Sequence, residues 1–214
     1  MRTFEYNTDL YPFRQIVSEW FDVDNISKLH EIKKYNLFDR EHDQSSKWHK
    51  VFYEKIREDN SFNELYVKFL TDFVKPWYEE EIVYQKIPTF RVHLVGNVAV
   101  GDWHKDRDYR NLNWAKKVKE LNYYVPLTAA YNTNTIWAET SEDKKDFEPM
   151  EANYGECIEW GASWLTHGNK VNETTVSRVS FDFRVIPKSR YTDSNHLTIN
   201  TKTPFNIGGY YEVL

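Results

Sequence analysis

The sequence predicts a mainly β protein of the α+β class, in which N-terminal helices cover one face of an antiparallel sandwich or barrel. Two observations lead to this class. In the first 85 or so residues, apolar positions recur at intervals of three and four, which is the period of an amphipathic helix. From about residue 86 to residue 187 the pattern changes to short alternating segments separated by turn residues, which is typical of antiparallel strands.

The helical region contains three segments with a helical period. The clearest follows Ser61, which forms a capping-box pattern with Glu64, and Pro76 ends its regular run. Its apolar stripe consists of Phe62, Leu65, Tyr66, Phe69, Leu70, Phe73 and Trp77. Weaker helical patterns cover about 12–21 and 46–57. Such helices need an apolar surface to cover, and we expect the strands to provide it.

The second region predicts a series of strands. We expect them at 89–95, 98–104, 120–130, 135–139, 159–167 and 177–186. Gly96-Asn97, between the first two, is a hairpin signal. Residues 188–214 form a tail that the pattern does not place, and we favour packing on the barrel over a lid.

The last predicted strand indicates which of its two faces lines the interior of the barrel. Along it, polar residues alternate with apolar ones: Arg178, Ser180, Asp182 and Arg184 against Val179, Phe181, Phe183 and Val185. A plain sandwich would turn the apolar set toward its partner sheet. Because the N-terminal helices are rich in aromatic residues, we expect the reverse, with the polar set lining the interior and the apolar set meeting the helices.

Composition limits the classes of function. The chain has 214 residues and a formal net charge of −5, which argues against nucleic-acid binding because such proteins need a basic surface. No secretory leader pattern and no apolar run of about 18 residues occur, so we expect neither secretion nor a membrane span. Cys157 is the single cysteine, which fits a reducing cytoplasm. We expect one domain over 1–214, with a helical layer (1–85), a barrel core (86–187) and a tail (188–214). Its partner would be a small molecule, and oligomeric state has no signal.

His104, Asp106 and His167 are the candidate metal ligands. Residues two apart on a strand point the same way, with Cα atoms about 6.5–7 Å apart, so His104 and Asp106 can converge on one ion. A third ligand must come from elsewhere, and His167 lies at the end of another predicted strand. Two imidazoles and one carboxylate form the facial triad of non-haem Fe(II) sites and leave metal positions open. The same ligand types also hold Zn²⁺. A surface pair and a loop histidine are the alternative.

Three further features strengthen the metal interpretation. They are the run NYYVPLT from Asn122 to Thr128, the run TNTIWAE from Thr133 to Glu139, and Arg178-Val179-Ser180 after the second histidine. Together with the ligands, they resemble the Fe(II)/2-oxoglutarate-dependent dioxygenase superfamily, over about 88–187. Within it they are similar to a small-molecule branch met in streptomycin biosynthesis clusters and in marine phage and bacterial genomes.

The resemblance implies a fold and a set of roles. The fold would be a double-stranded β-helix, that is, a jelly-roll or cupin-like barrel. His104, Asp106 and His167 would bind Fe(II), while Arg178 and Ser180 would hold the distal carboxylate of 2-oxoglutarate. The guanidinium offers a planar fork to a carboxylate, and a buried one needs an anionic partner. An internal carboxylate, Asp182 or Asp102, is the alternative partner.

Weaker candidates lie on neighbouring strands. Asn122 and Tyr124 share a strand face and are expected to make further 2-oxoglutarate contacts, although a structural tyrosine is the alternative. Trp137, Glu139 and Arg107 are expected near the substrate. For Glu139 a cross-strand ion pair is the alternative, and for Arg107 a solvated charge cluster.

The implied reaction is oxidation of a small polar substrate by O₂, most simply hydroxylation, with decarboxylation of 2-oxoglutarate to succinate. Desaturation, cyclisation and epimerisation use the same ligands and stay open. One rival is a cupin-type metal-dependent hydrolase or isomerase, which leaves Arg178 and Ser180 unexplained. The other is a non-catalytic jelly-roll protein that binds a ligand in a polar interior.

Overall fold

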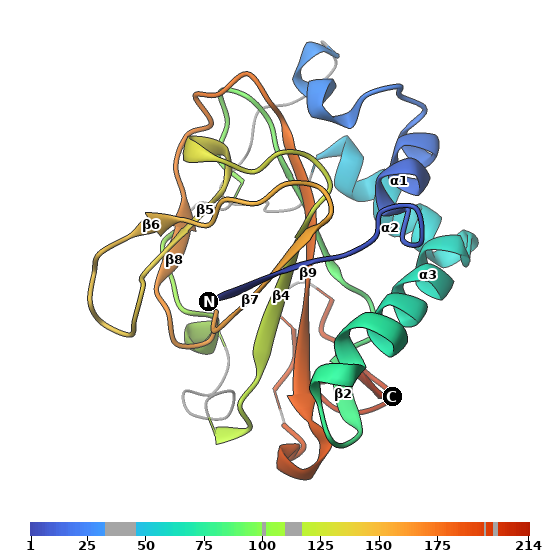
Figure 1. The fold of residues 1–214 in the computed structure, drawn as a ribbon, viewed down its shortest axis with the longest axis vertical. Helices are drawn as coiled ribbons and strands as arrows, with labels where there is room; N and C mark the ends of the chain where they lie inside the picture. The colour runs from blue at the N-terminus through green and yellow to red at the C-terminus, as the bar shows by residue number, and fades with distance from the viewer. Residues whose placement is uncertain (33–45, 100–101, 110–116, 195, 199–200) are drawn as a thin grey trace.

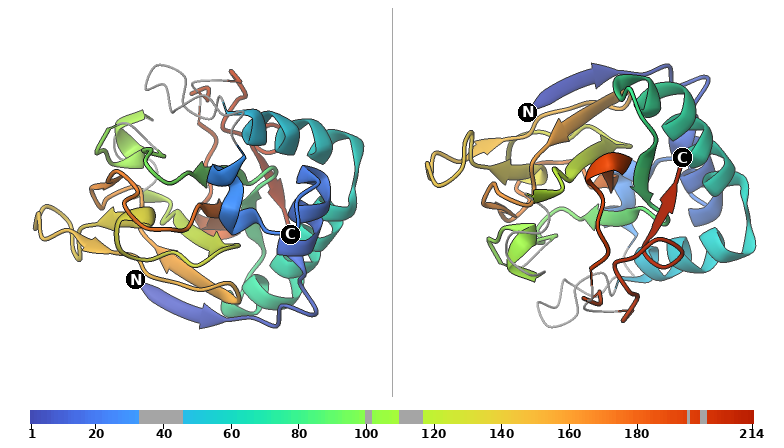
Figure 2. Two further views of the ribbon diagram at one scale, coloured as in Figure 1. Left: turned by 90° about the horizontal axis from the view of Figure 1, so that it is seen from above. Right: turned by 90° about the horizontal axis from the view of Figure 1, so that it is seen from below.

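The computed structural model describes residues 1–32, 46–99, 102–109, 117–194, 196–198 and 201–214. These residues form mainly antiparallel β structure, with helices packed on one side of a large sheet and a smaller sheet on the other side (Figures 1 and 2). In the part of the chain described, every helix is too short or too polar to cross a membrane.

The large sheet runs through the middle of the molecule. Its strands follow the order β1-β7-β4-β9-β2-β10, and β3 also pairs with β9. The strands are β1 (Arg2–Glu5), β2 (Ile82–Gln85), β3 (Thr89–His93), β4 (Leu121–Pro126), β7 (Glu156–Trp160), β9 (Arg178–Pro187) and β10 (Tyr211–Val213). The long strand β9 pairs with β4 along one edge and with β3 and β2 along the other. It is therefore the central strand of the sheet.

The smaller sheet has the order β6-β5-β8. Its strands are β5 (Ile136–Ala138), β6 (Glu148–Pro149) and β8 (His167–Asn169). Ala138 pairs with His167 across β5 and β8, and an isolated bridge joins His104 to His167. The small sheet thus brings two histidines from distant parts of the chain side by side.

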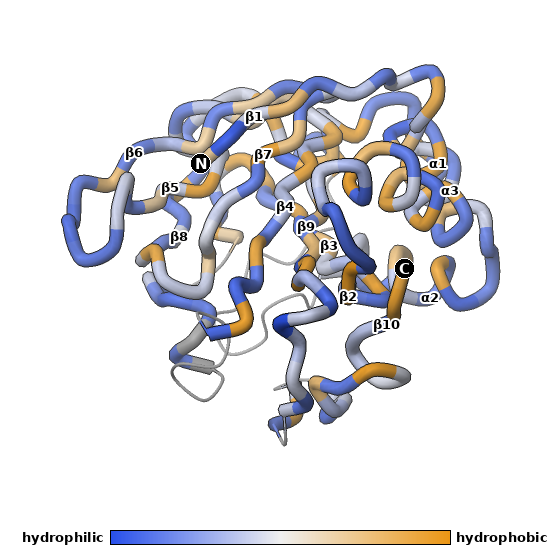
Figure 3. The backbone as a smooth tube through the Cα atoms, turned by 60° about the horizontal axis from the view of Figure 1, so that its bottom comes forward, coloured by the Kyte–Doolittle hydropathy of each residue, from blue (hydrophilic) through white to orange (hydrophobic). Residues whose placement is uncertain are grey.

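Three α-helices lie in the described residues: α1 (Phe13–Phe21), α2 (Lys47–Glu58) and α3 (Ser61–Phe69). Figure 3 shows apolar and polar segments alternating along α1 and α3, as amphipathic helices require. The predicted capping box at Ser61 does not form, since Asn60 is the N-cap residue and makes no side-chain cap. The helix then widens into a π turn (Leu70–Val74) and a 3₁₀ turn (Lys75–Trp77). Pro76 lies in the latter and lacks the N–H that would continue the ladder.

Aromatic side chains join the helices to β9. Phe181 packs against Phe13 and Phe62, with ring centroids 4.9 and 5.5 Å apart, and Phe183 packs against Tyr66 at 5.3 Å. All five residues are buried. Burial of such a side chain contributes on the order of 1.5–3 kcal/mol. The predicted orientation of β9 is confirmed: its apolar face meets the helices, and its polar face is left for the other side of the sheet.

The hairpin predicted at Gly96-Asn97 is wrong. Gly96 has a turn conformation with φ of +79°, but its N–H donates to the carbonyl of Asn172, and Asn172 N–H donates to that of Asn97, both at 2.8 Å. The described part of 98–104 is therefore not a strand, and β3 pairs with β9 instead. The predicted strand 159–167 is also divided, because β7 ends at Trp160 and β8 begins at His167.

Four short strands lie where none was predicted, and one of them is the two-residue strand β6. The strands β1 and β2 fall inside the region read as helical, and β10 falls in the tail. The tail packs on the sheet, because β10 pairs with β2 and the backbone of Leu214 exchanges two hydrogen bonds with that of Ile82.

Candidate metal centre

The structure brings His104, Asp106 and His167 together. His104 and His167 exchange two backbone hydrogen bonds of 2.9 Å, and Asp106 begins a 3₁₀ turn two residues after His104. Each Nε2 atom lies 3.6 Å from Asp106 Oδ1, and one ligand atom from each residue lies within 4.8 Å of the others. Donor atoms bonded to one ion at about 2.1 Å are roughly 3.0–4.2 Å apart, so the carboxylate–imidazole separations suit a shared cation.

Hydrogen bonds fix which nitrogen of each imidazole faces the site. His104 Nδ1 lies 2.8 Å from the carbonyl of Asp102, and His167 Nδ1 lies 3.0 Å from that of Leu165. A carbonyl only accepts, so each Nδ1 carries the proton and donates it. Both Nε2 atoms then present lone pairs to the common centre, which is the form in which imidazole binds a metal.

Burial and charge act differently on the two imidazoles. Burial lowers the pKa of His167 to about 4, so its ring is neutral at pH 7. Burial also acts to lower the pKa of His104, but the hydrogen bond and the charge of Asp106 outweigh it and raise the pKa above its ordinary value. A cation at the centre competes with a proton for the same Nε2 lone pairs.

Hydrogen bonds hold the Asp106 carboxylate at Oδ2, the oxygen that does not face the imidazoles. Its Oδ2 accepts a hydrogen bond from Arg184 Nη2 at 2.6 Å and a longer one from Asn122 Nδ2 at 3.4 Å. These contacts occupy Oδ2 and leave Oδ1 directed at the two imidazoles. Asn122, which was predicted as a cosubstrate contact, thus lies against a ligand carboxylate, while its own Oδ1 has no hydrogen-bond partner.

A pocket opens beside the three candidate ligands. It is lined by Arg91, His104, Asp106, Asn122, Tyr124, Ile136, Trp160, Ala162, His167, Gly168, Asn169, Arg178, Ser180, Asp182 and Arg184. The polar face of β9 therefore forms one wall, as predicted, and the two sheets contribute the others. The predicted residues Arg178, Ser180, Asn122 and Tyr124 all line this space.

Several buried donors of the pocket residues lack a hydrogen-bond acceptor among the described residues. Arg178 is 1% exposed, and its guanidinium has only a 3.5 Å hydrogen bond from Nη1 to Tyr124 OH. Arg178 Nε, Ser180 Oγ and Trp160 Nε1 are buried and form no hydrogen bond within the part of the chain that the structure describes. Among the described residues, no carboxylate forms an ion pair with Arg178, although the charge of Asp182 interacts with it from a greater distance. An unsatisfied buried polar group costs about 1–3 kcal/mol, which favours a ligand that accepts these hydrogen bonds.

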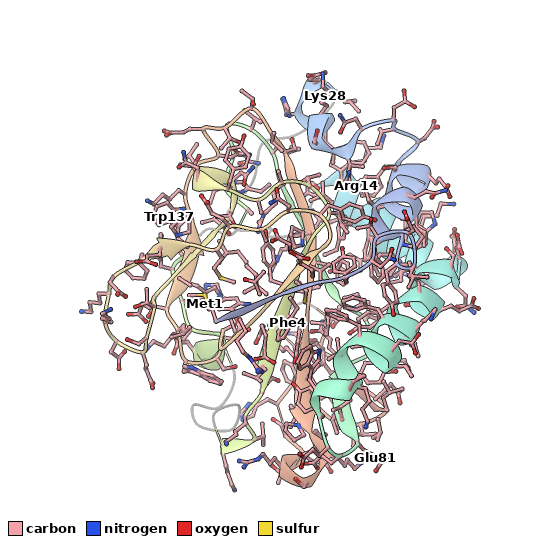
Figure 4. All side chains as sticks on the ribbon, viewed as in Figure 1. Met1, Phe4, Arg14, Lys28, Glu81 and Trp137 are labelled. Atoms are coloured by element: carbon pink, nitrogen blue, oxygen red, sulfur yellow. The ribbon has the colours of Figure 1, made fainter. Side chains whose placement is uncertain are left out.

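The residues predicted to contact substrate are placed differently. Trp137 projects on the side of the small sheet away from the helices (Figure 4), and its Nε1 donates to the carbonyl of Asn132. Ile136, one position earlier, lines the pocket instead. Glu139 is buried, and its carboxylate accepts hydrogen bonds from the backbone N–H groups of Lys145 and Thr166. The side chain of Arg107 lies outside the described residues.

Sequence reasoning missed two pocket residues with marked contacts. Trp160, at the end of β7, packs edge-on against His167 with ring centroids 4.8 Å apart. Arg184 holds Asp106, although the alternation of β9 identified only the face on which it lies. Neither residue type has a spacing signal in a strand, so only the fold reveals these contacts.

Comparisons with known proteins agree with this architecture. No family model matches the chain. The streptomycin biosynthesis protein StrG of Streptomyces griseus is 36% identical over 210 residues, which cover 98% of this chain and 96% of that protein. Among solved structures, the non-heme monooxygenase ThoJ in complex with nickel has a TM-score of 0.50 and 12% identity, covering 91% of this chain and 75% of ThoJ. Its apo form gives a TM-score of 0.51. The ThoJ likeness shows a shared fold. The identity to StrG over nearly the whole chain shows that this protein belongs to the StrG family.

Proposed function

We propose that this protein is an Fe(II)- and 2-oxoglutarate-dependent dioxygenase that oxidises, most simply hydroxylates, a small polar organic substrate. In this proposal the large and small sheets are the two walls of a double-stranded β-helix, and the helices, barrel and tail form one domain. The same fold in a non-heme monooxygenase with nickel is consistent with the proposal.

One observation carries the proposal: a cationic, unsatisfied guanidinium shares a pocket with an open triad of metal ligands. A metal held by His104, Asp106 and His167 has positions left for other ligands. One carboxylate and two neutral imidazoles would leave a bound divalent ion with a net positive charge. Arg178 adds a second positive group in the same pocket. A dianionic 2-oxo acid would offer negative charge both to the metal and to Arg178.

The side chains divide the work of binding. Fe(II) with 2-oxoglutarate would supply oxidation by O₂, coupled to decarboxylation to succinate. Arg178 and Ser180 would hold the distal carboxylate through charge-assisted hydrogen bonds, which are the strong ones. Trp160 Nε1 is a further donor in the pocket, and Tyr124 OH, which accepts from Arg178, orients the guanidinium. A hydrolase or isomerase site gives these donors no purpose.

The test measures cosubstrate binding and turnover separately. Calorimetry with Mn²⁺ and N-oxalylglycine, an inert analogue of 2-oxoglutarate, is expected to show metal-dependent binding that disappears in His104→Ala. His196→Ala is the matched control, because this histidine is exposed and is not among the residues that line the pocket. Succinate formation from 2-oxoglutarate with Fe(II) and ascorbate follows, over a panel of small polar substrates.

Each result separates the proposed function from its rivals. Activity with Zn²⁺, without 2-oxoglutarate binding, would instead support a hydrolase or isomerase. Ligand binding that survives His104→Ala and chelator treatment would support a non-catalytic binding protein.

A further inference from the structure

A partly buried polar network joins the C-terminal segment to Asp106. Its members are Arg184 on β9, Glu120 just before β4, and the consecutive tyrosines Tyr210 and Tyr211 at the start of β10. We name these four residues the C-terminal clamp. None of them belongs to the three candidate metal ligands, and the tyrosines lie more than a hundred residues from Asp106 in sequence.

Arg184 is the centre of the clamp. Its Nη2 donates to Asp106 Oδ2 at 2.6 Å, and its Nη1 donates to Tyr210 OH at 2.5 Å and to Gln85 Oε1 at 3.0 Å. Its Nε lies 3.7 Å from Glu120 Oε1. The guanidinium is planar and its donors point in fixed directions, so partners on several sides determine where the Nη2 donor points.

Glu120 holds the opposite side of the guanidinium. Its side chain is fully buried. Ser163 Oγ donates to Glu120 Oε1 at 3.2 Å, and Tyr211 OH donates to Oε2. A buried carboxylate needs both a countercharge and hydrogen bonds, and Arg184 and Tyr211 supply one of each.

The turn before β10 brings the hydroxyl groups of Tyr210 and Tyr211 to Arg184 and Glu120, respectively. Neighbouring residues of a strand point to opposite faces, so two consecutive hydroxyls converge only if the backbone bends between them. Gly208 has a φ of +86°, and the N–H of Tyr211 donates to the carbonyl of Asn206. A Cβ atom on Gly209 would lie 2.6 Å from the backbone oxygen of Pro204. The turn therefore requires glycine, and its shape serves the clamp.

Apolar side chains pack around the inner part of the clamp, where Glu120 and Tyr211 are buried. The buried members of this cluster are Val83, Val118, Ile186, Phe205 and Tyr211. The ring of Phe205 packs on that of Tyr210 at 4.7 Å, and the Tyr210 ring packs on that of Tyr211 at 4.9 Å. In such surroundings hydrogen bonds between charged groups are stronger and less mobile than at the surface.

We propose that the C-terminal clamp is part of the metal centre, and that Arg184, Glu120, Tyr210 and Tyr211 are positioning residues that set the direction of the Asp106 carboxylate. The inference rests on the metal site of the proposed function. Through Arg184 the clamp occupies Asp106 Oδ2 and directs Oδ1 to the metal. Metal affinity then depends on the last residues of the chain, although none of them contacts the ion.

Variants that keep the side-chain charge test this inference, because they change how the Asp106 carboxylate is held without removing a charge from the site. Mn²⁺ dissociation constants are measured by electron paramagnetic resonance without any cosubstrate. Arg184→Lys, a point charge that cannot reach all its partners, is expected to weaken Mn²⁺ binding about 10-fold, which is typical when a partner of a metal ligand is lost. The double variant Tyr210→Phe with Tyr211→Phe is expected to weaken it roughly threefold or more.

Tyr191→Phe is the matched control. It lies in the same C-terminal tail, but its hydroxyl donates to the exposed Asp193, and it is expected to leave Mn²⁺ affinity unchanged. Thermal unfolding of every variant identifies those that are merely less stable, and all affinities are measured well below the unfolding temperature.

Three outcomes are distinguishable. The inference is supported if both clamp variants lose affinity while the control does not. It is overturned if the clamp variants are less stable but bind Mn²⁺ as tightly as the parent protein, because the tail then has only a structural role. If His104→Ala also binds Mn²⁺ normally, the metal centre itself, and with it the proposed function, is wrong.

Discussion

Replacing Arg178 with methionine is expected to stabilise the ligand-free protein and to abolish cosubstrate binding. Arg178 is buried with one long hydrogen bond, and no described carboxylate pairs with it. Replacing buried ion pairs by apolar side chains of similar volume is often neutral or stabilising by about 1–4 kcal/mol, and Arg178 has no ion-pair partner among the described residues to offset its desolvation. We expect about 1–2 kcal/mol here, because Tyr124 loses a weak contact. For a chain of this length this raises Tm by roughly 2–8 °C.

Binding is expected to change in the opposite direction. Two charge-assisted hydrogen bonds to a carboxylate contribute about 1.5–3 kcal/mol each. Their loss weakens binding of N-oxalylglycine to the Mn²⁺ protein by about 10²–10⁴-fold. Differential scanning calorimetry measures the rise in Tm, and isothermal titration calorimetry with Mn²⁺ present measures the loss of N-oxalylglycine affinity.

Arg14→Met is the matched control. Arg14 lies on α1 (Figure 4), where its Nε donates to the carbonyl of Leu127 at 2.8 Å and its guanidinium covers the ring of Tyr154. Its loss is expected to destabilise the protein and to leave N-oxalylglycine binding intact. If Arg178→Met instead lowers Tm by as much as this control, Arg178 has a structural partner, and the reasoning from its unsatisfied burial is refuted.

Three other predictions follow from single contacts. Glu139→Gln leaves one of two backbone N–H groups without an acceptor, so we expect the free energy of unfolding to fall by about 1–3 kcal/mol. Calorimetry measures this loss, and cosubstrate binding is expected to stay unchanged. A large loss of binding would show that Glu139 has a role in the pocket. Burial raises the pKa of Tyr53 and of Tyr78 from 10.0 to about 12, so the unfolded chain binds fewer protons between these values and stability falls as pH rises from 10 to 12. Urea titrations should show this slope, and it should be shallower in Tyr53→Phe; an equal slope would contradict the assignment. A Cβ on Gly168 would lie 2.6 Å from the Trp103 ring, so Gly168→Ala must displace the residue before His104, and Mn²⁺ affinity should fall; an unchanged affinity would show that the indole moves aside freely.

Strong periodicity in the sequence was enough to predict the three helices and the two faces of β9. Both features depend on residues within one segment, so local sequence contains them. The strands β1 and β10 have four and three residues, too few for a pattern to distinguish them from their surroundings. The hairpin at Gly96 failed for a related reason: the turn itself formed, but Asn172, its hydrogen-bond partner, lies 76 positions away.

The candidate site likewise contains features that the sequence could predict and contacts that it could not. The meeting of the three candidate ligands was predictable because metal chemistry restricts the residue types and, for His104 and Asp106, the spacing. Arg178 and Ser180 were predictable through a resemblance, and the structure adds that Arg178 Nε and Ser180 Oγ have no hydrogen-bond partner among the described residues. The contacts of Arg184 were not predictable, because they require knowing that Asp106, Glu120 and the C-terminal tyrosines meet in space. Trp137 was predicted in place of Ile136 because a three-residue strand gives no independent sign of which face is inside.

The central strand β9 has a consequence for how the sequence of this protein can change. Deleting or inserting one residue within it would exchange the surfaces on either side, presenting phenyl rings to the cation and guanidinium groups to the helices. Folding and chemistry would then be lost in the same event, so indels are excluded from this segment. New specificity must arise in the connecting loops around the pocket mouth, where length can vary without turning the sheet inside out.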